Sequence, residues 1–389
     1  MNININQKDL KDAIEKVERL LHKSFLPVLD SVLLQADNNK ITITVNNLTS
    51  TLTVNVDGEI IDPGSILIDK SNFKLIKKLS GFLSIKSNDN MGMKNISDEE
   101  EKEEVINNTV TIKANRNLKF TSTLPEEYPE ILQDINEVAF TIAENIFKDK
   151  LKIKAFVAKN HFRQVFNGVL IFKDDIVTSN THHMVRYKLN TENKCDGQIN
   201  IPIQSINELD KILNNKSTSK LQFTYKKDDG NDVTHIQITG KDFVYITRLT
   251  EGVFPNYEAV IPNSFCTEIN IEKHKLQDTV EFIGDMITDA KDNVKPIVFD
   301  ITDKLEARTS KNYSKSMSEI LPSDITGDEL LIGFNSTYID NFLKTIKEDK
   351  INIKCAGKKS PAIFIGENNE CELYVLVPLN PEIGYDTVA

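Results

Sequence analysis

The spacing of apolar residues changes along the N-terminal part of the chain from a helical period to an alternating one. Leu10, Ile14, Val17 and Leu21 recur every three or four residues, which predicts a helix with one apolar face. The following segments VLDSVLLQ, KITITV and TSTLTVNV are rich in alternating β-branched residues and are separated by turn-forming Asn and Gly residues. We therefore expect one helix followed by a run of short strands. A second helix is predicted from Asn72 to Leu79.

This arrangement occurs three times. The segments GSILIDKSNFKLIKKL, GQINIPIQSINELDKIL and DELLIGFNSTYIDNFLKTI each join a strand to a helix, and the interval from Ile66 to Ile199 equals that from Ile199 to Ile332. A second set of apolar residues, upstream of these segments in each repeat, recurs with the same overall period. We predict three α+β domains over residues 1–125, 126–260 and 261–389, each with two helices, joined at TSTLPEEYPEI and TEGVFPNYEAVIPN.

One segment departs from the repeat. Residues 88–108 form a polar insertion that contains the acidic run SDEEEKEE. Blocks of like charge usually stay solvated, so we expect a mobile surface loop. The alternative is an acidic patch that binds a partner.

Composition excludes several classes of protein. The chain has 47 Lys and Arg against 58 Asp and Glu, a net charge of −11, which is unlike a protein that binds nucleic acid by being basic throughout. No apolar run is long enough to span a bilayer, so we expect a cytoplasmic protein without membrane contact. The four cysteines have neither metal-site nor disulfide-framework spacing and are expected to be reduced.

Motifs of catalysis are missing from the sequence. No glycine-rich phosphate loop, nucleophile elbow or HExxH motif is present, so we expect no catalytic residue, no cofactor and no metal. The one histidine pair, His182 and His183, would point to opposite faces of a strand, which suits shared metal ligation poorly. A metal- or carboxylate-dependent enzyme with these histidines in its site stays open as an alternative.

Lysines cluster on predicted helices of different repeats, although the chain is acidic overall. Such helices, lining a ring of repeated domains, would give a basic channel that DNA could thread through backbone contacts alone. The clusters comprise Lys70, Lys74, Lys77 and Lys78, then Lys148, Lys150, Lys152, Lys154 and Lys159, and finally Lys344, Lys347 and Lys350.

Five segments, in order and spacing, resemble the bacterial sliding clamp, the β subunit of the replicative DNA polymerase. They are SFLPVLDSVLLQAD, FRQVFNGVLIF, RLTEGVFPNYEAVIP, LLIGFNSTYIDNFLK and YVLVPL. The resemblance implies three repeated DNA-clamp domains with antiparallel sheets that close into a ring as a head-to-tail homodimer. It implies a non-catalytic protein that encircles double-stranded DNA and confers processivity, with the replicative polymerase, the clamp loader and other clamp-motif proteins as partners.

The family binds partners through a short peptide that docks between its second and third domains. Matched by motif, the cleft in this chain would combine apolar walls with a few polar groups. Its residues would be Phe166, Ser179, Thr181, His182, His183, Met184, Pro255, Val260, Val375, Leu376, Val377, Pro378 and Leu379.

The chain departs from the family at two places near this cleft. The family commonly has Thr-Asp-Gly-His-Arg-Leu where this chain has Ser179 to Met184, so a glycine and a long cation are missing. Pro381 to Ala389 extend beyond the usual end of the family. This tail either covers part of the cleft or extends freely, and the second is favoured.

Residues that face DNA and that close the ring are also implied. The resemblance places Lys23, Asn160 and Arg163 near DNA, and helix clustering adds Lys70, Lys74, Lys77, Lys148, Lys152 and Lys154. Ile283 and Met286 are expected to meet strands near residues 105–115 of another copy. A clamp relative that binds partners without encircling DNA is the remaining alternative.

Overall fold

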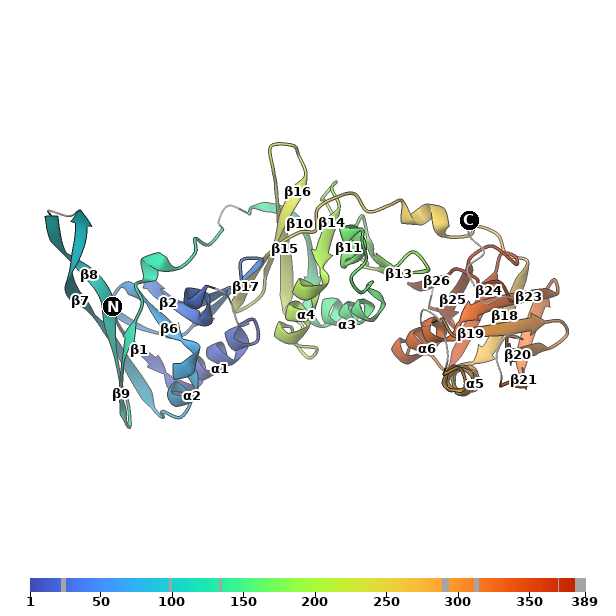
Figure 1. Cartoon of the computed structure of the whole chain (residues 1–389), viewed down its shortest axis with the longest axis horizontal. Helices are drawn as coiled ribbons and strands as arrows, with labels where there is room; N and C mark the ends of the chain where they lie inside the picture. The colour runs from blue at the N-terminus through green and yellow to red at the C-terminus, as the bar shows by residue number, and fades with distance from the viewer. Residues whose placement is uncertain are drawn as a thin grey trace. The chain divides into compact units, whose positions relative to one another are not determined.

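The protein is described by a computed structural model that covers residues 1–21, 26–97, 100–132, 135–288, 294–310, 315–369 and 371–381. It consists of two compact units, whose helices and strands are labelled in Figure 1. Unit 1 comprises Met1–Lys148 and Gln204–Leu249, and unit 2 comprises Asp149–Ile203 and Thr250–Ala389. The division into three domains at residues 125 and 260 stays a prediction.

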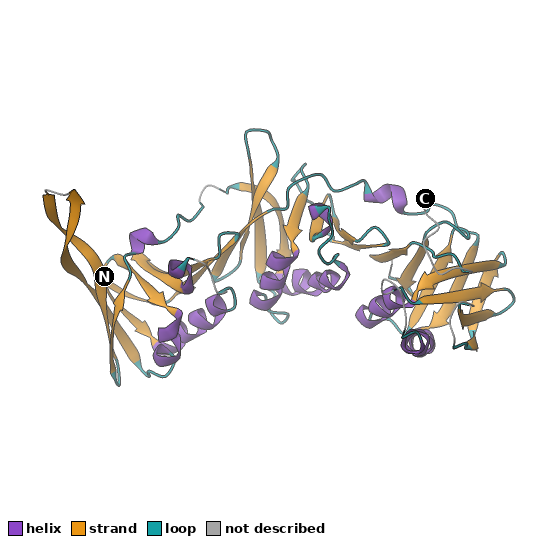
Figure 2. Cartoon of the chain, in the orientation of Figure 1, coloured by secondary structure: helices purple, strands orange, loops and turns teal. Residues whose placement is uncertain are grey.

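Unit 1 holds two antiparallel sheets, with strand orders β5-β1-β7-β8-β9 and β10-β15-β16-β17-β4-β3-β2-β6. The strands are β1 (Asn2–Asn6), β2 (Ser31–Asp37), β3 (Lys40–Asn46), β4 (Ser50–Val56), β5 (Gly58–Asp62), β6 (Gly64–Asp69), β7 (Phe82–Ser97), β8 (Glu100–Lys113), β9 (Asn117–Ser122), β10 (Glu137–Ala143), β15 (Lys220–Lys227), β16 (Val233–Thr239) and β17 (Phe243–Arg248). Helices α1 (Gln7–Glu18) and α2 (Phe73–Ile76) lie on the same side of these strands (Figure 2). Helices α3 (Glu144–Lys150) and α4 (Ile203–Ile212) include the residues at which the chain passes between the units.

Unit 2 also holds two antiparallel sheets, with orders β14-β11-β12-β13-β26-β25-β24-β18-β22 and β21-β20-β19-β23. The strands are β11 (Gly168–Phe172), β12 (Asp175–Ser179), β13 (His183–Lys188), β14 (Ile199–Pro202), β18 (Thr267–Glu272), β19 (Pro296–Ile301), β20 (Leu305–Thr309), β21 (Ser318–Leu321), β22 (Ser323–Gly327), β23 (Leu330–Asn335), β24 (Lys350–Cys355), β25 (Ala362–Gly366) and β26 (Glu372–Leu376). Helices α5 (Lys273–Met286) and α6 (Ser336–Thr345) pack against each other. The expected α+β class with antiparallel sheets is confirmed.

The helical periodicity places the first three predicted core positions correctly, whereas Leu21, the fourth, lies beyond α1 and is half-buried. Leu10, Ile14 and Val17 of α1 are buried, and Asn6 caps the helix by accepting a hydrogen bond from the backbone of Lys8. The predicted second helix is shorter than expected: α2 follows a single 3₁₀ turn, Lys70–Asn72, and is four residues long.

Equivalent turns show how one repeat joins the next. Asn47 and Asn180 are separated by the same interval as Ile66 and Ile199, and each accepts hydrogen bonds from the backbone of its own turn. Each also donates from Nδ2 to a helix of the following repeat: Asn47 to Glu208 Oε1 at 3.0 Å, and Asn180 to the Tyr338 hydroxyl at 3.1 Å. Beside these turns β4 pairs with β17 and β13 pairs with β26, so a sheet continues across each joint.

The acidic insertion is not the mobile loop that the sequence suggested. Backbone pairing between β7 and β8 begins at Ser84 and Lys113 and continues into the insertion, where Lys94 pairs with Lys102. The inserted residues prolong an existing hairpin, so their backbone groups find partners in the ladder. The expectation of a loop was wrong for the described part of this segment.

Two other expectations concern cysteines and the membrane. All four cysteines are free thiols, as expected, and burial raises the pKa of Cys355 to about 12, which makes its thiol unreactive. Among the described residues, no helix has the length and apolar character needed to cross a membrane.

Candidate partner-binding site

A pocket of about 740 Å³ lies within unit 2 and combines residues of the second and third repeats. Its walls are the segment 155–161, the turn 180–183, the start of α6 and the chain after β26. Among its described lining residues none is acidic. The lining comprises Ala155, Phe156, Val157, Ala158, Lys159, His161, Asn180, Thr181, His182, His183, Val294, Asn335, Thr337, Tyr338, Asn341, Val377 and Leu379.

The turn between β12 and β13 forms one wall of the pocket. Asn180 holds it closed, because its Oδ1 accepts from the backbone N–H groups of His182 and His183 at 3.0 and 2.9 Å. Thr181 adopts a φ of 74°, in the left-handed region that favours glycine. The turn therefore keeps its shape without the family's glycine, at the cost of local backbone strain.

The two neighbouring histidines have different environments. His182 is exposed, whereas His183 is buried, and its Nε2 lies 3.0 Å from the carbonyl oxygen of Phe156. The rings of Tyr338 and Tyr374 pack around His183 with centroids 4.7 and 5.6 Å away. Burial lowers the pKa of His183 to about 4, so the ring is neutral at pH 7 and donates from Nε2 to Phe156.

This lowered pKa has a consequence for stability. The unfolded chain binds a proton at His183 near pH 6.5 and the folded chain only near pH 4, so its stabilising contribution is present above pH 6.5 and is lost as the pH falls toward 4. We expect His183→Gln to remove about 2 kcal/mol of the stability change between pH 7 and pH 5. Urea unfolding at both pH values measures it. His182→Gln is the control and should leave the change as in the parent; equal effects of both variants would contradict the assignment.

Part of the pocket wall was missed by the sequence analysis. Thr337, Tyr338 and Asn341 come from α6, and Asn335, at the end of β23, caps the start of this helix by accepting from the backbone of Thr337. Their segment was recognised only as a repeat landmark. The missing information was the pairing between repeats, since the turn at Asn180 meets the helix of the next repeat through Tyr338.

The predicted cleft residues separate into two groups. Thr181, His182, His183, Val377 and Leu379 line the pocket. The others do not line it: Phe166, Met184 and Val375 lie in a buried apolar cluster, Leu376 and Pro378 are buried, Ser179 donates to the carbonyl oxygen of His183, Pro255 is half-buried and Val260 is exposed. Their part in binding stays a prediction.

Phe166 is expected to act through stability. Its ring packs edge-on against Phe254 with centroids 5.4 Å apart, inside the buried cluster. Phe166→Ala should therefore destabilise the protein by about 3–5 kcal/mol because it leaves a cavity. Phe162→Ala, four residues earlier and 87% exposed, should change stability by less than about 0.5 kcal/mol. Denaturant unfolding compares them, and equal stabilities would contradict the burial of Phe166.

Comparison with known proteins places the chain. Residues 134–256 match the family described as DNA polymerase III beta subunit, central domain, and residues 258–380 match its C-terminal domain. The chain belongs to the DNA polymerase III beta subunit family.

Individual relatives cover almost the whole chain. The beta sliding clamp of Buchnera aphidicola is 25% identical over 97% of this chain and all of the relative, and that of Chlamydia muridarum is 22% identical over 97% and 99%. The DNA polymerase III subunit beta of Pseudomonas aeruginosa has the same fold, with a TM-score of 0.82 at 20% identity over 98% of this chain and all of that one. The beta subunit from Streptococcus pyogenes also gives 0.82, at 19% identity.

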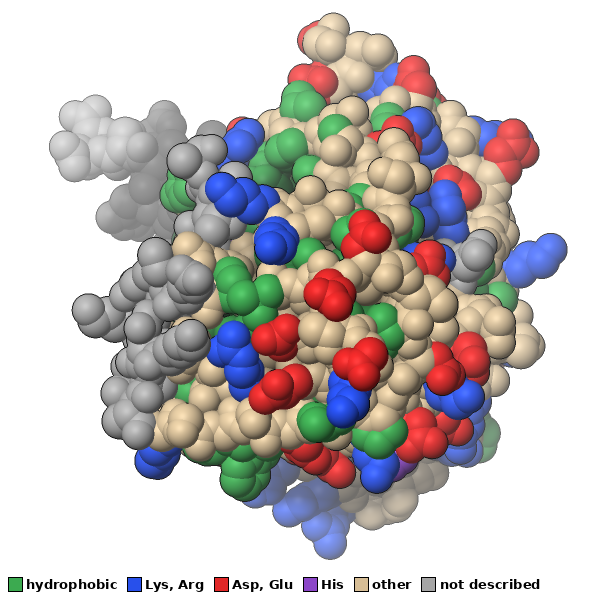
Figure 3. Space-filling view, turned by 90° about the vertical axis from the view of Figure 1, so that its right-hand side faces the viewer, with side chains coloured by type: hydrophobic (Ala, Val, Ile, Leu, Met, Phe, Trp, Pro, Cys, Tyr) green, Lys and Arg blue, Asp and Glu red, His purple; other side chains and the backbone are tan. Residues whose placement is uncertain are grey.

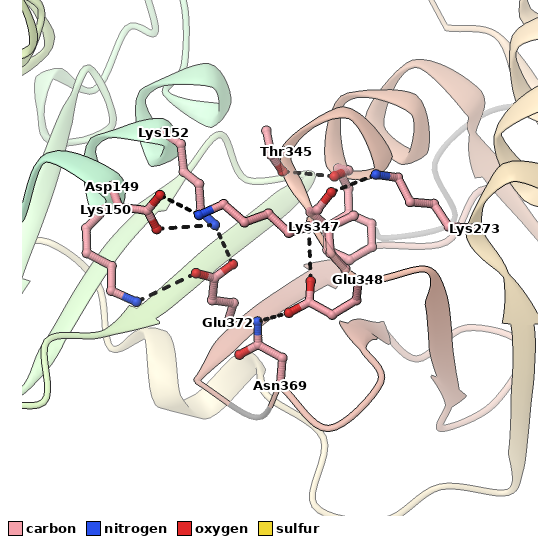
Figure 4. A network of polar contacts seen from close by, with 11 residues as sticks. Asp149, Lys150, Lys152, Lys273, Thr345, Lys347, Glu348, Asn369 and Glu372 are labelled. Carbon is pink, nitrogen blue, oxygen red and sulfur yellow. Dashed lines mark hydrogen bonds and ion pairs between the residues drawn. The ribbon is translucent and has the colours of Figure 1, made fainter. Parts of the chain in front are cut away.

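Several of the lysines predicted to face DNA form ion pairs with acidic residues of the same chain. Lys70 lies 2.6 Å from Asp30, Lys77 lies 2.7 Å from Glu18, and Lys148 lies 2.6 Å from Asp210. Lys152 lies 2.7 Å from Glu372, in a network with Asp149, Lys150 and Lys347 (Figure 4). The side chains of Lys148 and Lys152 are about one fifth exposed and each is paired within the chain; their assignment to DNA stays a prediction.

The other residues predicted to contact DNA differ in their exposure. Lys23 lies outside the described residues. Lys74, Asn160 and Arg163 are exposed, and Lys154 is half-buried. Arg163 also lies over the ring of Phe166, with its guanidinium carbon 5.6 Å from the ring centroid. These residues stay predictions.

One predicted dimer contact of the clamp needs correction. Ile283 is fully buried in the core of unit 2 and offers no surface to another copy. Met286 is half-buried. The exposed apolar residue on the same helix is Phe282, one position earlier than Ile283, because the apolar face of α5 turns inward against its own sheet.

The residues present give no support to metal chemistry. Within the described ranges, no three His, Cys, Asp or Glu side chains are grouped so that they could hold an ion. His183 is committed to Phe156, whereas His182 is exposed. The enzyme alternative therefore gains no support from the described part of the chain.

Proposed function

We propose that this protein is a sliding clamp: two copies join head to tail into a ring that encircles duplex DNA without reading its sequence, and the ring tethers the replicative polymerase. The protein would act in the cytoplasm with a clamp loader and without catalysis. The observation that carries the proposal is the continuation of sheets from repeat to repeat, with β9 and β21 left as sheet edges at the positions where the next joints of the series would form.

The repeat indicates which edges would meet. At the two joints within the chain, β4 pairs with β17 and β13 pairs with β26, both antiparallel. Strands β4 and β13 begin one repeat apart, at Ser50 and His183, and the strand that begins about one repeat after β13 is β21. Strands β17 and β26 also begin about one repeat apart, and the strand that begins about one repeat before β17 is β9. Both β21 and β9 are sheet edges, so a third joint of the same kind would form between copies.

Side chains near these edges suit such a joint. Ile320 on β21 and Phe282 on α5 are more than half exposed, as is Phe82 at the start of β7. Figure 3 looks onto the end of unit 2 that carries β20 and β21, where basic, acidic and apolar side chains share the surface. Exposed lysines occur in the first repeat, at Lys74 within α2, at Lys78 just after it and at Lys119 on β9.

The pocket would hold the peptide of a partner. Its volume suits a few side chains, its walls mix apolar groups with amide and hydroxyl groups, and it includes Lys159 and three histidines but no described acidic residue. A peptide with an aliphatic or aromatic anchor beside an acidic or polar residue fits this chemistry. Polymerase, clamp loader and other clamp-motif proteins would compete for it.

The proposed ring requires a dimer, and the mass of the protein in solution tests this requirement. Sedimentation equilibrium of the purified chain should give a mass near twice 44.1 kDa. A monomer at micromolar concentration that still binds clamp-motif peptides would favour a clamp relative that binds partners without encircling DNA. A monomer without peptide affinity would remove both readings.

A further inference from the structure

The three repeats share one hydrogen bond at the point where the chain leaves the last strand. Leu67, Asn200 and Gly333 are evenly spaced along the chain, and the carbonyl oxygen of each accepts one hydrogen bond from the final residue of the last strand of its repeat or from the segment just after that strand. The donors are the Ser122 hydroxyl at 2.7 Å, the Thr250 N–H at 2.8 Å and the Leu379 N–H at 2.7 Å. In the first two repeats this segment is an interdomain linker, and in the third it is the start of the C-terminal tail.

Both linkers place a tyrosine on the sheet they cross. Tyr128 follows Ser122 by six residues, packs on Leu33 and Leu67, and directs its hydroxyl to the carbonyl oxygen of Thr44 at 3.4 Å. Tyr257 follows Thr250 by seven residues, packs in the cluster that contains Leu170 and Val177, and donates to Asp175 Oδ2 at 2.9 Å. The tail has the same feature, because Tyr385 follows Leu379 by six residues and a proline stands between them, as in both linkers.

The strand ladders identify the equivalent surface in the third repeat. Leu170 pairs with Asn200 and Val177, and Val298 pairs in the same way with Gly333 and Arg308. Directly paired residues share one face of a sheet. By this register Arg308 corresponds to Val177, and Glu306, two residues earlier, corresponds to Asp175, the acceptor of the Tyr257 hydroxyl.

That surface contains a pocket of about 430 Å³. It is lined by Glu306, Arg308, Thr309, Ser310, Ser316, Met317 and Ser318. The tail already reaches it, since the Ser310 hydroxyl donates to the carbonyl oxygen of Pro381 at 3.5 Å. Tyr385 is four residues further on, a reach of up to about 13 Å in extended chain.

We propose that the tail is a third linker-like arm, whose Tyr385 ring docks into the pocket on β20 and β21 against Arg308 and donates its hydroxyl to Glu306. A ring over a guanidinium gains cation–π attraction, and a tyrosine hydroxyl needs a partner when it is covered. The arm then lies beside the edge strand β21 and leaves the partner-binding pocket open. That it would also run toward the neighbouring copy rests on the proposed function; the docking itself does not.

Site-specific photocrosslinking of the full chain tests the docking without DNA or a partner. Tyr385 is replaced by p-benzoylphenylalanine, light- and heavy-isotope chains are mixed, and crosslinks are mapped by mass spectrometry. We expect crosslinks within one chain to residues 306–318, with a yield lowered at least threefold by Arg308→Ala and unchanged by Arg186→Ala. Crosslinks to residues 155–161 or 180–183, crosslinks only between chains, or none would overturn the proposal.

A second measurement does not depend on the crosslinker. Deletion of residues 382–389 and the single change Tyr385→Ala should each speed amide hydrogen exchange in β20 and β21 several-fold, while Asp386→Asn should not. Peptide affinity at the partner-binding pocket should stay at the parent value. Unchanged exchange in both variants, or a gain in peptide affinity on deletion, would contradict docking at β20 and β21.

Discussion

Replacing Ile320 by Asp is expected to convert the dimer into a monomer. Ile320 is 59% exposed on β21, the edge strand that the repeat assigns to the joint between copies. A carboxylate there would be buried against a partner strand and would lie opposite Glu306, the residue paired with Ile320 on β20, which costs several kcal/mol. We expect the dimer dissociation constant to rise at least 100-fold, which corresponds to about 2.7 kcal/mol. Sedimentation velocity across a dilution series measures the change.

The same substitution at a different edge serves as the control. Ile61 is 51% exposed on β5, the opposite edge of the sheet that contains β9. Ile61→Asp should leave the dimer intact. If both variants dissociate alike, the effect is a general response to surface charge, and if neither does, β21 is not the joint.

Val377→Arg is expected to abolish peptide binding while leaving the dimer intact. Val377 lines the partner-binding pocket and is half-buried, and its backbone N–H donates to the carbonyl oxygen of His182 at 3.0 Å, a bond that the substitution keeps. A long cationic side chain would occupy the space meant for an apolar anchor. We expect affinity for a clamp-motif peptide to fall about 100-fold, measured by fluorescence anisotropy.

Val253→Arg makes the same exchange outside the pocket. Val253 is 78% exposed on the linker before α5 and is not among the pocket residues. It should bind the peptide as the parent does. Parent-like affinity in Val377→Arg would show that the pocket is not where partners dock, and a loss in both variants would point to charge alone.

Local patterns predicted the elements well because they depend on neighbours in sequence. The period of Leu10, Ile14 and Val17 was enough to place α1, since a helix buries one stripe. The even spacing of the strand-to-helix segments predicted a fold built from repeats, and the paired turns at Asn47 and Asn180 bear it out. The prediction for α2 was wrong only in its length: Phe73 and Ile76 are buried as an apolar face should be, but the helix ends before the predicted end at Leu79.

The sequence could not show which surface residues have partners far away along the chain. Lys148 looked like part of a basic face until Asp210 was found beside it, and Lys152 is paired with Glu372, 220 residues further on. Ile283 was chosen for an interface from its position on α5, yet the helix turns that face into its own core. Tyr338 could not be assigned to the pocket, because nothing local indicates that α6 meets the turn at Asn180. Charge and apolarity are readable residue by residue, but exposure is not.

The central claim is that two copies enclose DNA, and retention on circular DNA tests it most directly. Protein is loaded by a clamp loader onto nicked circles, washed at high salt to remove bound but unlinked chains, and then challenged by cutting the circle once. The account predicts that the protein stays on intact circles through the wash and leaves within minutes of linearisation, and that Ile320→Asp is lost in the wash. Equal retention on circular and linear DNA, or loss from both, would contradict encirclement.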